Sequence, residues 1–220
     1  MIIKNLKTNR ITNPLGFDLG KPRLSWITES DKSRKQKAAQ IQVALDNKFH
    51  NVILDTGMDI QIDSICYELK IELKPYTRYY WKVTVWTDND EISTSDIAWF
   101  ETAKLKTPWN AKWITPDFES NIHPVMYKTF NIEKEVLSAR VYMTSLGLYE
   151  LYINEDKAGK EYLAPNFNAY DKWIQYQTYN ITENIVSGEN KIEIPLGNGW
   201  YKGRTFGFAP NKINTYGDKF

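Results

Sequence analysis

The chain has 220 residues, which is enough for one large or two modest domains, each with its own hydrophobic core. Its 28 basic and 27 acidic side chains leave a formal net charge of +1, so no global field favours nucleic acid or an anionic membrane as a partner. Because Cys66 is the only cysteine, an internal disulfide and a thiolate metal cluster are both excluded.

The N-terminal residues give no targeting signal. Residues 1–7 lack a sustained apolar core and a small-residue cleavage site, and no later stretch is apolar for long enough to cross a bilayer. Together with the single cysteine, this favours a cytoplasmic location and no membrane partner. Aromatic residues make up 14% of the chain. Trp and Tyr suit both sandwich cores and the stacking of sugar rings, and core packing is the commoner role for any one ring.

Strand signals dominate the first half of the chain. Four short segments are rich in β-branched and aromatic residues and alternate apolar with polar positions. These segments are 23–28, 39–44, 79–86 and 98–102. The alternation buries one face of each strand, and the polar run 87–91 predicts a turn. We therefore expect an antiparallel sandwich of fibronectin type III character over residues 1–104.

The pattern lapses over residues 104–116, where two prolines interrupt any strand ladder. We interpret this segment as a linker held by Trp109 and Trp113. Strand signals then resume at 124–132, 139–144, 148–154, 174–179 and 190–195. They predict a second, jelly-roll-like (galactose-binding-like) β-sandwich over residues 105–220, so the fold class is all-β.

Few other elements are expected in the second half. The best helical candidate is the short segment 182–186, and residues 199–208 are predicted to form a long loop. The sequence stops at 218–220 without another strand, whereas a sandwich of this kind normally ends on a strand that closes a sheet. We therefore expect the second sandwich to be truncated.

Eight segments resemble, in order, the N-terminal region of bacterial α-L-rhamnosidases. Examples are Leu163-Ala-Pro-Asn-Phe-Asn-Ala-Tyr-Asp171 and Leu196-Gly-Asn-Gly-Trp-Tyr-Lys-Gly203. The full set is 13–26, 40–44, 80–86, 111–114, 145–154, 163–171, 176–182 and 196–203. Each segment alone is weak evidence, but the set in this order is specific and covers nearly the whole chain.

The resemblance implies a chemistry that this chain does not itself carry. Enzymes of the family hydrolyse a terminal α-L-rhamnose with inversion, using one carboxylic acid to protonate the leaving oxygen and one carboxylate to activate water. These groups belong to a downstream helical barrel, whereas strand signals run through almost all of this sequence. The implied partner is therefore a catalytic domain of the same polypeptide, and this portion is expected to be inactive.

No catalytic, metal or cofactor site is predicted from the residues themselves. Acidic residues such as Glu150, Glu155 and Asp156 are expected to lie on solvated strand faces or in turns. His50 and His123 lie far apart in sequence, without a neighbouring Cys or His at ligand spacing. The sequence also gives no support for a calcium site.

One short segment, residues 196–204, is a candidate binding site. Closely spaced glycines precede or surround Asn198, Trp200, Tyr201 and Arg204. An indole beside an amide and a guanidinium could stack on a sugar and hydrogen-bond its hydroxyls. The same residue types are favoured at protein interfaces, so they could instead form the seam against the catalytic domain. An aromatic and Arg cluster alone does not distinguish the two roles. Of the two, we favour the seam.

Three functional hypotheses follow. The first is a non-catalytic accessory and scaffold region of an α-L-rhamnosidase. The second is an autonomous carbohydrate-binding module that recognises L-rhamnose-containing glycans through the four residues named above. The third, an adhesive protein of fibronectin-like modules, is disfavoured by the sugar-enzyme motifs of the second half. Fold likeness does not establish function, so the enzyme assignment depends on the family resemblance.

Overall fold

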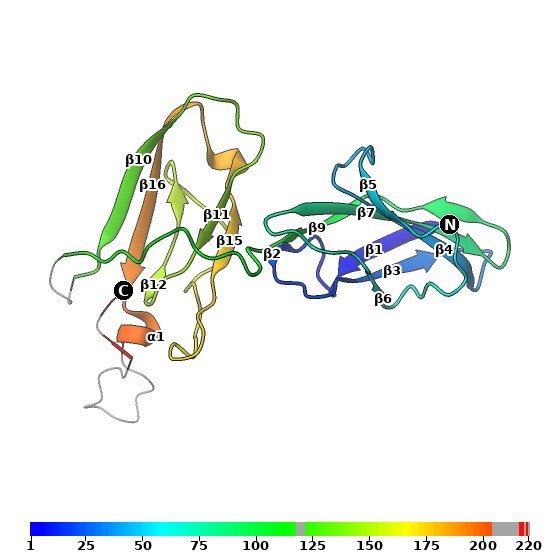
Figure 1. The fold of residues 1–220 in the computed structure, drawn as a ribbon, viewed down its shortest axis with the longest axis horizontal. Helices are drawn as coiled ribbons and strands as arrows, with labels where there is room; N and C mark the ends of the chain where they lie inside the picture. Colours follow the sequence, from blue (N-terminus) through cyan, green and yellow to red (C-terminus); the bar gives the residue numbers. More distant parts are fainter. Residues whose placement is uncertain (118–121, 204–215, 218, 220) are drawn as a thin grey trace. The chain divides into compact units, whose positions relative to one another are not determined.

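The computed structural model describes residues 1–117, 122–203, 216, 217 and 219 (Figure 1). The chain forms two compact units, Met1–Pro108 and Trp109–Phe220, and each has its own hydrophobic core. Strands provide nearly all of the regular structure, which confirms the predicted all-β class. The finer predictions, a boundary at residue 104 and a linker over 104–116, stay predictions. In the described part of the chain, no helix is long and apolar enough to span a membrane.

Unit 1 contains two β-sheets. The strands of the larger sheet are, in spatial order, β2 (Leu15–Phe17), β9 (Ala98–Thr102), β7 (Arg78–Thr87), β4 (Gln36–Ala44) and β5 (Val52–Asp55), and β8 (Ile92–Thr94) also pairs with β7. The smaller sheet is β1 (Ile2–Thr8), β3 (Arg23–Glu29) and β6 (Tyr67–Glu68). Neighbouring strands are antiparallel except β2 and β9, which are parallel.

Strand β7 is the centre of unit 1, because its alternation places every second side chain in the core. Trp81 is fully buried and lies opposite Val43 on β4 and Ala98 on β9. Tyr79 stacks on Phe100, with ring centroids 5.0 Å apart. The predicted strand 79–86 is thus confirmed nearly residue for residue, because its alternation reports one buried and one partly exposed face.

The described residues of unit 2 also form two sheets. The larger has the order β10 (Val125–Ile132), β16 (Gly188–Gly197), β13 (Tyr152–Ile153) and β14 (Asp156–Lys157), and β12 (Leu148–Tyr149) also pairs with β16. The smaller consists of β11 (Arg140–Met143) and β15 (Gln177–Asn180). A 3₁₀ turn, Thr182–Asn184, and a short helix α1, Gly199–Lys202, complete the elements of the described part.

The core of unit 2 includes buried tyrosines that pair through their hydroxyls. Tyr179 donates to the hydroxyl of Tyr149 at 3.1 Å, and Tyr149 donates to Oε1 of Gln177 at 2.7 Å. Burial raises the pKa of Tyr149, and the neighbouring Tyr179 adds to the shift. These bonds satisfy phenol groups that would otherwise be costly inside the core.

Three local predictions for unit 2 are wrong. The expected strand 148–154 is divided into β12 and β13, because the backbone between them turns to other partners: Ala158 N donates to Leu151 O. The expected strand 174–179 begins only at Gln177, since Gln175 is held by side chains of Thr144 and Asn168. The expected loop after residue 198 begins with α1, where Gly203 N donates to Gly199 O at 3.0 Å.

Candidate functional site

The predicted site residues lie where β16 ends and α1 begins. Asn198 occupies the N-cap position of α1, and Trp200 and Tyr201 lie within the helix. Arg204 is outside the described residues. The sequence folds this way because Gly199 has a φ of +57°, and a Cβ there would lie 2.9 Å from Cγ of Leu148. Only glycine therefore lets the chain turn from β16 into α1 so close to β12.

Trp200 and Tyr201 belong to two neighbouring groups of rings. We call their members together the aromatic cluster: Phe167, Tyr170, Trp200, Tyr201 and Tyr216. Trp200 meets Phe167 edge-on at 6.2 Å, and Tyr201 meets Tyr170 edge-on at 5.2 Å. Tyr216 stacks on Tyr201 at 6.2 Å. Burial raises the pKa of Tyr170. The two predicted rings are therefore packed against other rings of the cluster.

The loop between β14 and β15 carries two of the five rings of this cluster and is fixed by a buried amide. Asn168 is fully buried; its Nδ2 donates to Asn166 O and its Oδ1 accepts from Gln175 N, both at 2.9 Å. Phe167 and Trp173 of the same loop are about half exposed, at 48% and 52%. Sequence reasoning did not select these two residues, although Phe167 lies in one of the family-like segments.

A second apolar feature of unit 2 is a cavity of about 360 Å³. Its floor consists of core side chains that are only partly buried, although Leu196 is nearly covered. The main apolar lining residues are Trp109, Trp113, Ile114, Met126, Val141, Met143, Ile192, Ile194 and Leu196. At its polar edge, the hydroxyls of Thr144 and Ser145 already donate to backbone carbonyls of Gln175 and Gly147. Apolar contact is therefore the chemistry that this cavity offers.

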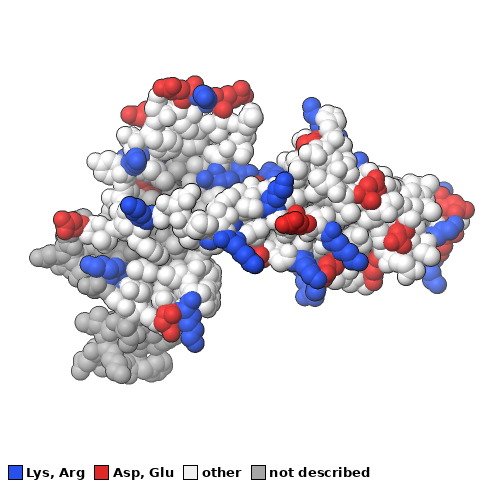
Figure 2. All heavy atoms as spheres, in the orientation of Figure 1, with Lys and Arg blue, Asp and Glu red and all other residues white. Residues whose placement is uncertain are grey.

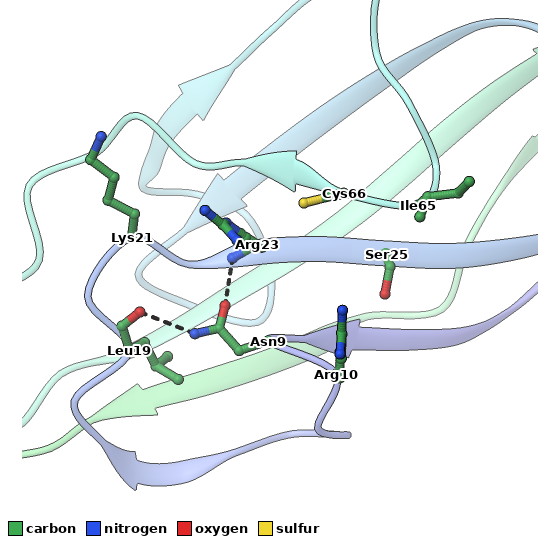
Figure 3. A pocket seen from close by; sticks show the side chains of 8 residues that line it. All are labelled: Asn9, Arg10, Leu19, Lys21, Arg23, Ser25, Ile65 and Cys66. Atoms are coloured by element: carbon green, nitrogen blue, oxygen red, sulfur yellow. Dashed lines mark hydrogen bonds between the residues drawn. The ribbon is translucent and has the colours of Figure 1, made fainter.

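Unit 1 has an open, polar depression of about 600 Å³ (Figure 3). Asn9 shapes it by donating from Nδ2 to Leu19 O at 3.0 Å and accepting from Arg23 N at 2.7 Å. Lys21 and Arg23 at its rim are exposed and both pair with Glu68, at 3.1 and 3.6 Å. Such solvated, mutually satisfied charges are typical of a surface and contribute little to binding.

Acidic side chains in both units have structural partners. Glu101, which is buried, accepts from Arg78 at 2.8 Å, and Glu150 accepts from the Tyr152 hydroxyl at 2.6 Å. Among the residues described, no three His, Cys, Asp or Glu side chains converge as metal ligands. Figure 2 shows acidic and basic side chains interspersed on the visible face of unit 1. We assign no catalytic role to any of these groups.

Two family models match the chain. The model "Rha78A-like, N-terminal immunoglobulin domain" matches residues 3–106, and "Alpha-L-rhamnosidase N-terminal domain" matches residues 134–220. The immunoglobulin fold shares its sandwich architecture with the predicted fibronectin-like fold, so a sandwich of this class is confirmed for the first unit. The jelly-roll type of the second unit stays a prediction.

Curated relatives agree with these models. An α-L-rhamnosidase of Formosa agariphila is 33% identical over 226 residues, covering 88% of this chain and 24% of the relative. An α-L-rhamnosidase of Alteromonas sp. (strain LOR) is 32% identical over 212 residues, covering 87% of this chain and 23% of the relative. The chain thus spans about a quarter of the length of the curated relatives it matches.

Solved structures agree as well. The α-L-rhamnosidase from Dictyoglumus thermophilum matches with a TM-score of 0.79 and 33% identity, over 91% of this chain and 26% of that one. The Streptomyces avermitilis α-L-rhamnosidase complexed with L-rhamnose matches with a TM-score of 0.88 over 99% of this chain and 38% of that one. At 20% identity, the second match supports the fold alone.

Proposed function

Because its two units belong to the N-terminal domain families of α-L-rhamnosidases, we propose that this chain is a non-catalytic scaffold region of such an enzyme. Its partner is a downstream catalytic domain of the same polypeptide, which removes terminal α-L-rhamnose with inversion. The observation that carries the scaffold role is the aromatic cluster at α1, in which Phe167 packs edge-on against Trp200 and is still about half exposed. Trp173, in the same loop as Phe167, is also about half exposed.

The geometry of this surface favours a protein seam over a sugar site. The cluster rings pack against one another, two pairs of them edge-on, so covering them costs little side-chain entropy. Aromatic residues are also enriched at interface cores. A sugar site needs hydrogen-bonding groups that reach the ligand. Asn198 is the predicted sugar-binding residue next to Trp200 that could supply such a group, but its Oδ1 is buried away from solvent. We therefore place the seam at Phe167, Trp173 and Trp200.

Trp173→Ala tests this seam when it is made in two contexts. In the 220-residue chain the exposed indole contributes little, so we expect an unchanged melting temperature. In the full-length rhamnosidase the same change should remove a buried interface contact, lowering the melting temperature by about 2–4 °C for each kcal/mol lost. Leu137→Ala, at an 86% exposed position of the same unit, is the control. Equal effects in both contexts would contradict the seam.

The carbohydrate-binding alternative makes a different prediction from the same residues. If Asn198, Trp200, Tyr201 and Arg204 bind L-rhamnose, titration with the sugar should change the tryptophan fluorescence saturably, and Trp200→Ala should abolish the change. The scaffold role predicts a flat response from folded protein, since the Trp200 indole already packs against Phe167.

A further inference from the structure

The outer face of the larger sheet of unit 2 carries an ordered row of side chains. Strands β10, β16, β13 and β14 lie in that order, and Figure 1 shows β10 and β16 side by side. Tyr127 pairs with Glu193, Glu193 with Tyr152, and Tyr152 with Lys157. The neighbouring residues Ile192, Ile194 and Ile153 point into the core, so the row faces outward.

The first half of the row is centred on Tyr127, which is 72% exposed. The ammonium group of Lys191 lies 5.6 Å from the centre of the Tyr127 ring and 2.8 Å from Oε1 of Glu193. The lysine therefore links an exposed phenol ring to a carboxylate on the adjacent strand. The contact with the Lys191 ammonium favours one orientation of the Tyr127 ring, so holding the ring in that orientation costs little side-chain entropy.

The second half of the row repeats this arrangement. Tyr152 donates its hydroxyl to Oε2 of Glu150 at 2.6 Å, and the same carboxylate lies 3.9 Å from Nζ of Lys157. Lys157 in turn lies 3.5 Å from the centre of the Tyr162 ring, which is 70% exposed. We call Tyr127, Tyr152 and Tyr162, with the charged residues between them, the tyrosine face.

We propose that the tyrosine face binds a linear, neutral glycan that runs across the strands. Because β16 separates β10 from β13, Tyr127 and Tyr152 are two strand spacings apart, about 10 Å. This matches the length of about two pyranose units, so alternate sugars can stack their C–H faces on successive rings. Glu193 lies between the rings and can accept hydrogen bonds from hydroxyls.

The charge pattern favours a neutral glycan over other occupants. Lys191 is paired with Glu193, and Lys157 is close to Glu150, so the row offers hydrogen-bond donors and acceptors with little net field. A polyanion would have to break these pairs. A protein partner is disfavoured because interface cores are depleted in charge, whereas here a charged side chain separates the rings. This site is separate from the aromatic cluster and does not depend on the scaffold role.

Affinity gel electrophoresis of the 220-residue chain tests the proposal. The gels contain hydroxyethyl cellulose, arabinoxylan or galactomannan as neutral glycans, and polygalacturonate as the anionic comparator. We expect retardation by at least one neutral glycan, with a dissociation constant raised at least tenfold in Tyr127→Ala and in Tyr152→Ala. Tyr127→Phe should keep binding, because stacking needs the ring and not the hydroxyl.

Trp173→Ala serves as the control that separates this site from the seam, since it removes a half-exposed ring outside the tyrosine face. It should leave retardation unchanged. Circular dichroism verifies that each variant is folded; Tyr127 is exposed, so its two variants are expected to fold as the parent chain does. Retardation by none of the neutral glycans, by polygalacturonate alone, or equally for the tyrosine variants and the parent chain would overturn the proposal. A failed seam test would leave it intact.

Discussion

Trp81→Ala is expected to lower the free energy of unfolding of unit 1 by about 3–5 kcal/mol. Trp81 is fully buried at the centre of β7, between Val43 on β4 and Ala98 on β9. Removing the indole leaves a cavity that the paired strands on both sides prevent from collapsing. Because unit 2 has its own core, its stability should be unchanged.

Hydrogen exchange followed by mass spectrometry measures the two units separately, because peptides from β7 and β16 report local opening of each. Exchange should accelerate in β7 and not in β16. Trp86→Ala is the matched control, since Trp86 lies on the same strand but on its partly exposed face. Equal acceleration by the two substitutions, or acceleration in β16, would contradict this account of the core.

The second expected result is a loss of about 3 kcal/mol from unit 2 in Asn190→Ala. Asn190 is buried, and its amide makes four hydrogen bonds. Its Oδ1 accepts from Val186 N and from Nδ2 of Asn154, and its Nδ2 donates to Val186 O and Gly188 O, at 2.8 to 3.0 Å. Alanine would leave these partners unsatisfied in a site that water reaches poorly.

Asn131→Ala is the control for this substitution, because Asn131 is an exposed asparagine on the neighbouring strand β10. Urea unfolding should show a lower midpoint for Asn190→Ala alone, and exchange should accelerate in β16 but not in β7. Asn190→Ala would then accelerate exchange in β16 alone and Trp81→Ala in β7 alone, which would establish that the units unfold separately. A midpoint equal to that of the parent chain would show that the Asn190 network is dispensable.

The fold could be predicted from the sequence where one periodicity describes a whole element. Strand 79–86 is predicted from its alternation, and the structure extends it by only one residue at each end. Prediction failed where a side chain replaces a backbone partner. Gln175 looks like a strand residue, but its N–H goes to Asn168 and its carbonyl to Thr144. Such long-range bonds leave no periodic signal.

The candidate sites differ in the same way. Asn198, Trp200 and Tyr201 are neighbours in the sequence, so their proximity could be predicted without a structure. Phe167 joins Trp200 only through the packing of the loop that Asn168 holds. The tyrosine face depends on the non-sequential order β10–β16–β13, which no local pattern encodes. Residues brought together by sheet order therefore have to be found in the structure.

We propose that this chain supports catalysis without performing it. The most direct test is hydrolysis of an aryl α-L-rhamnoside by the purified 220-residue chain at high protein concentration, beside the full-length enzyme. We predict release of the aryl group at the uncatalysed rate for the chain and rapid turnover for the full-length enzyme. Turnover that rises in proportion to the concentration of the chain, and persists through repurification, would contradict the claim.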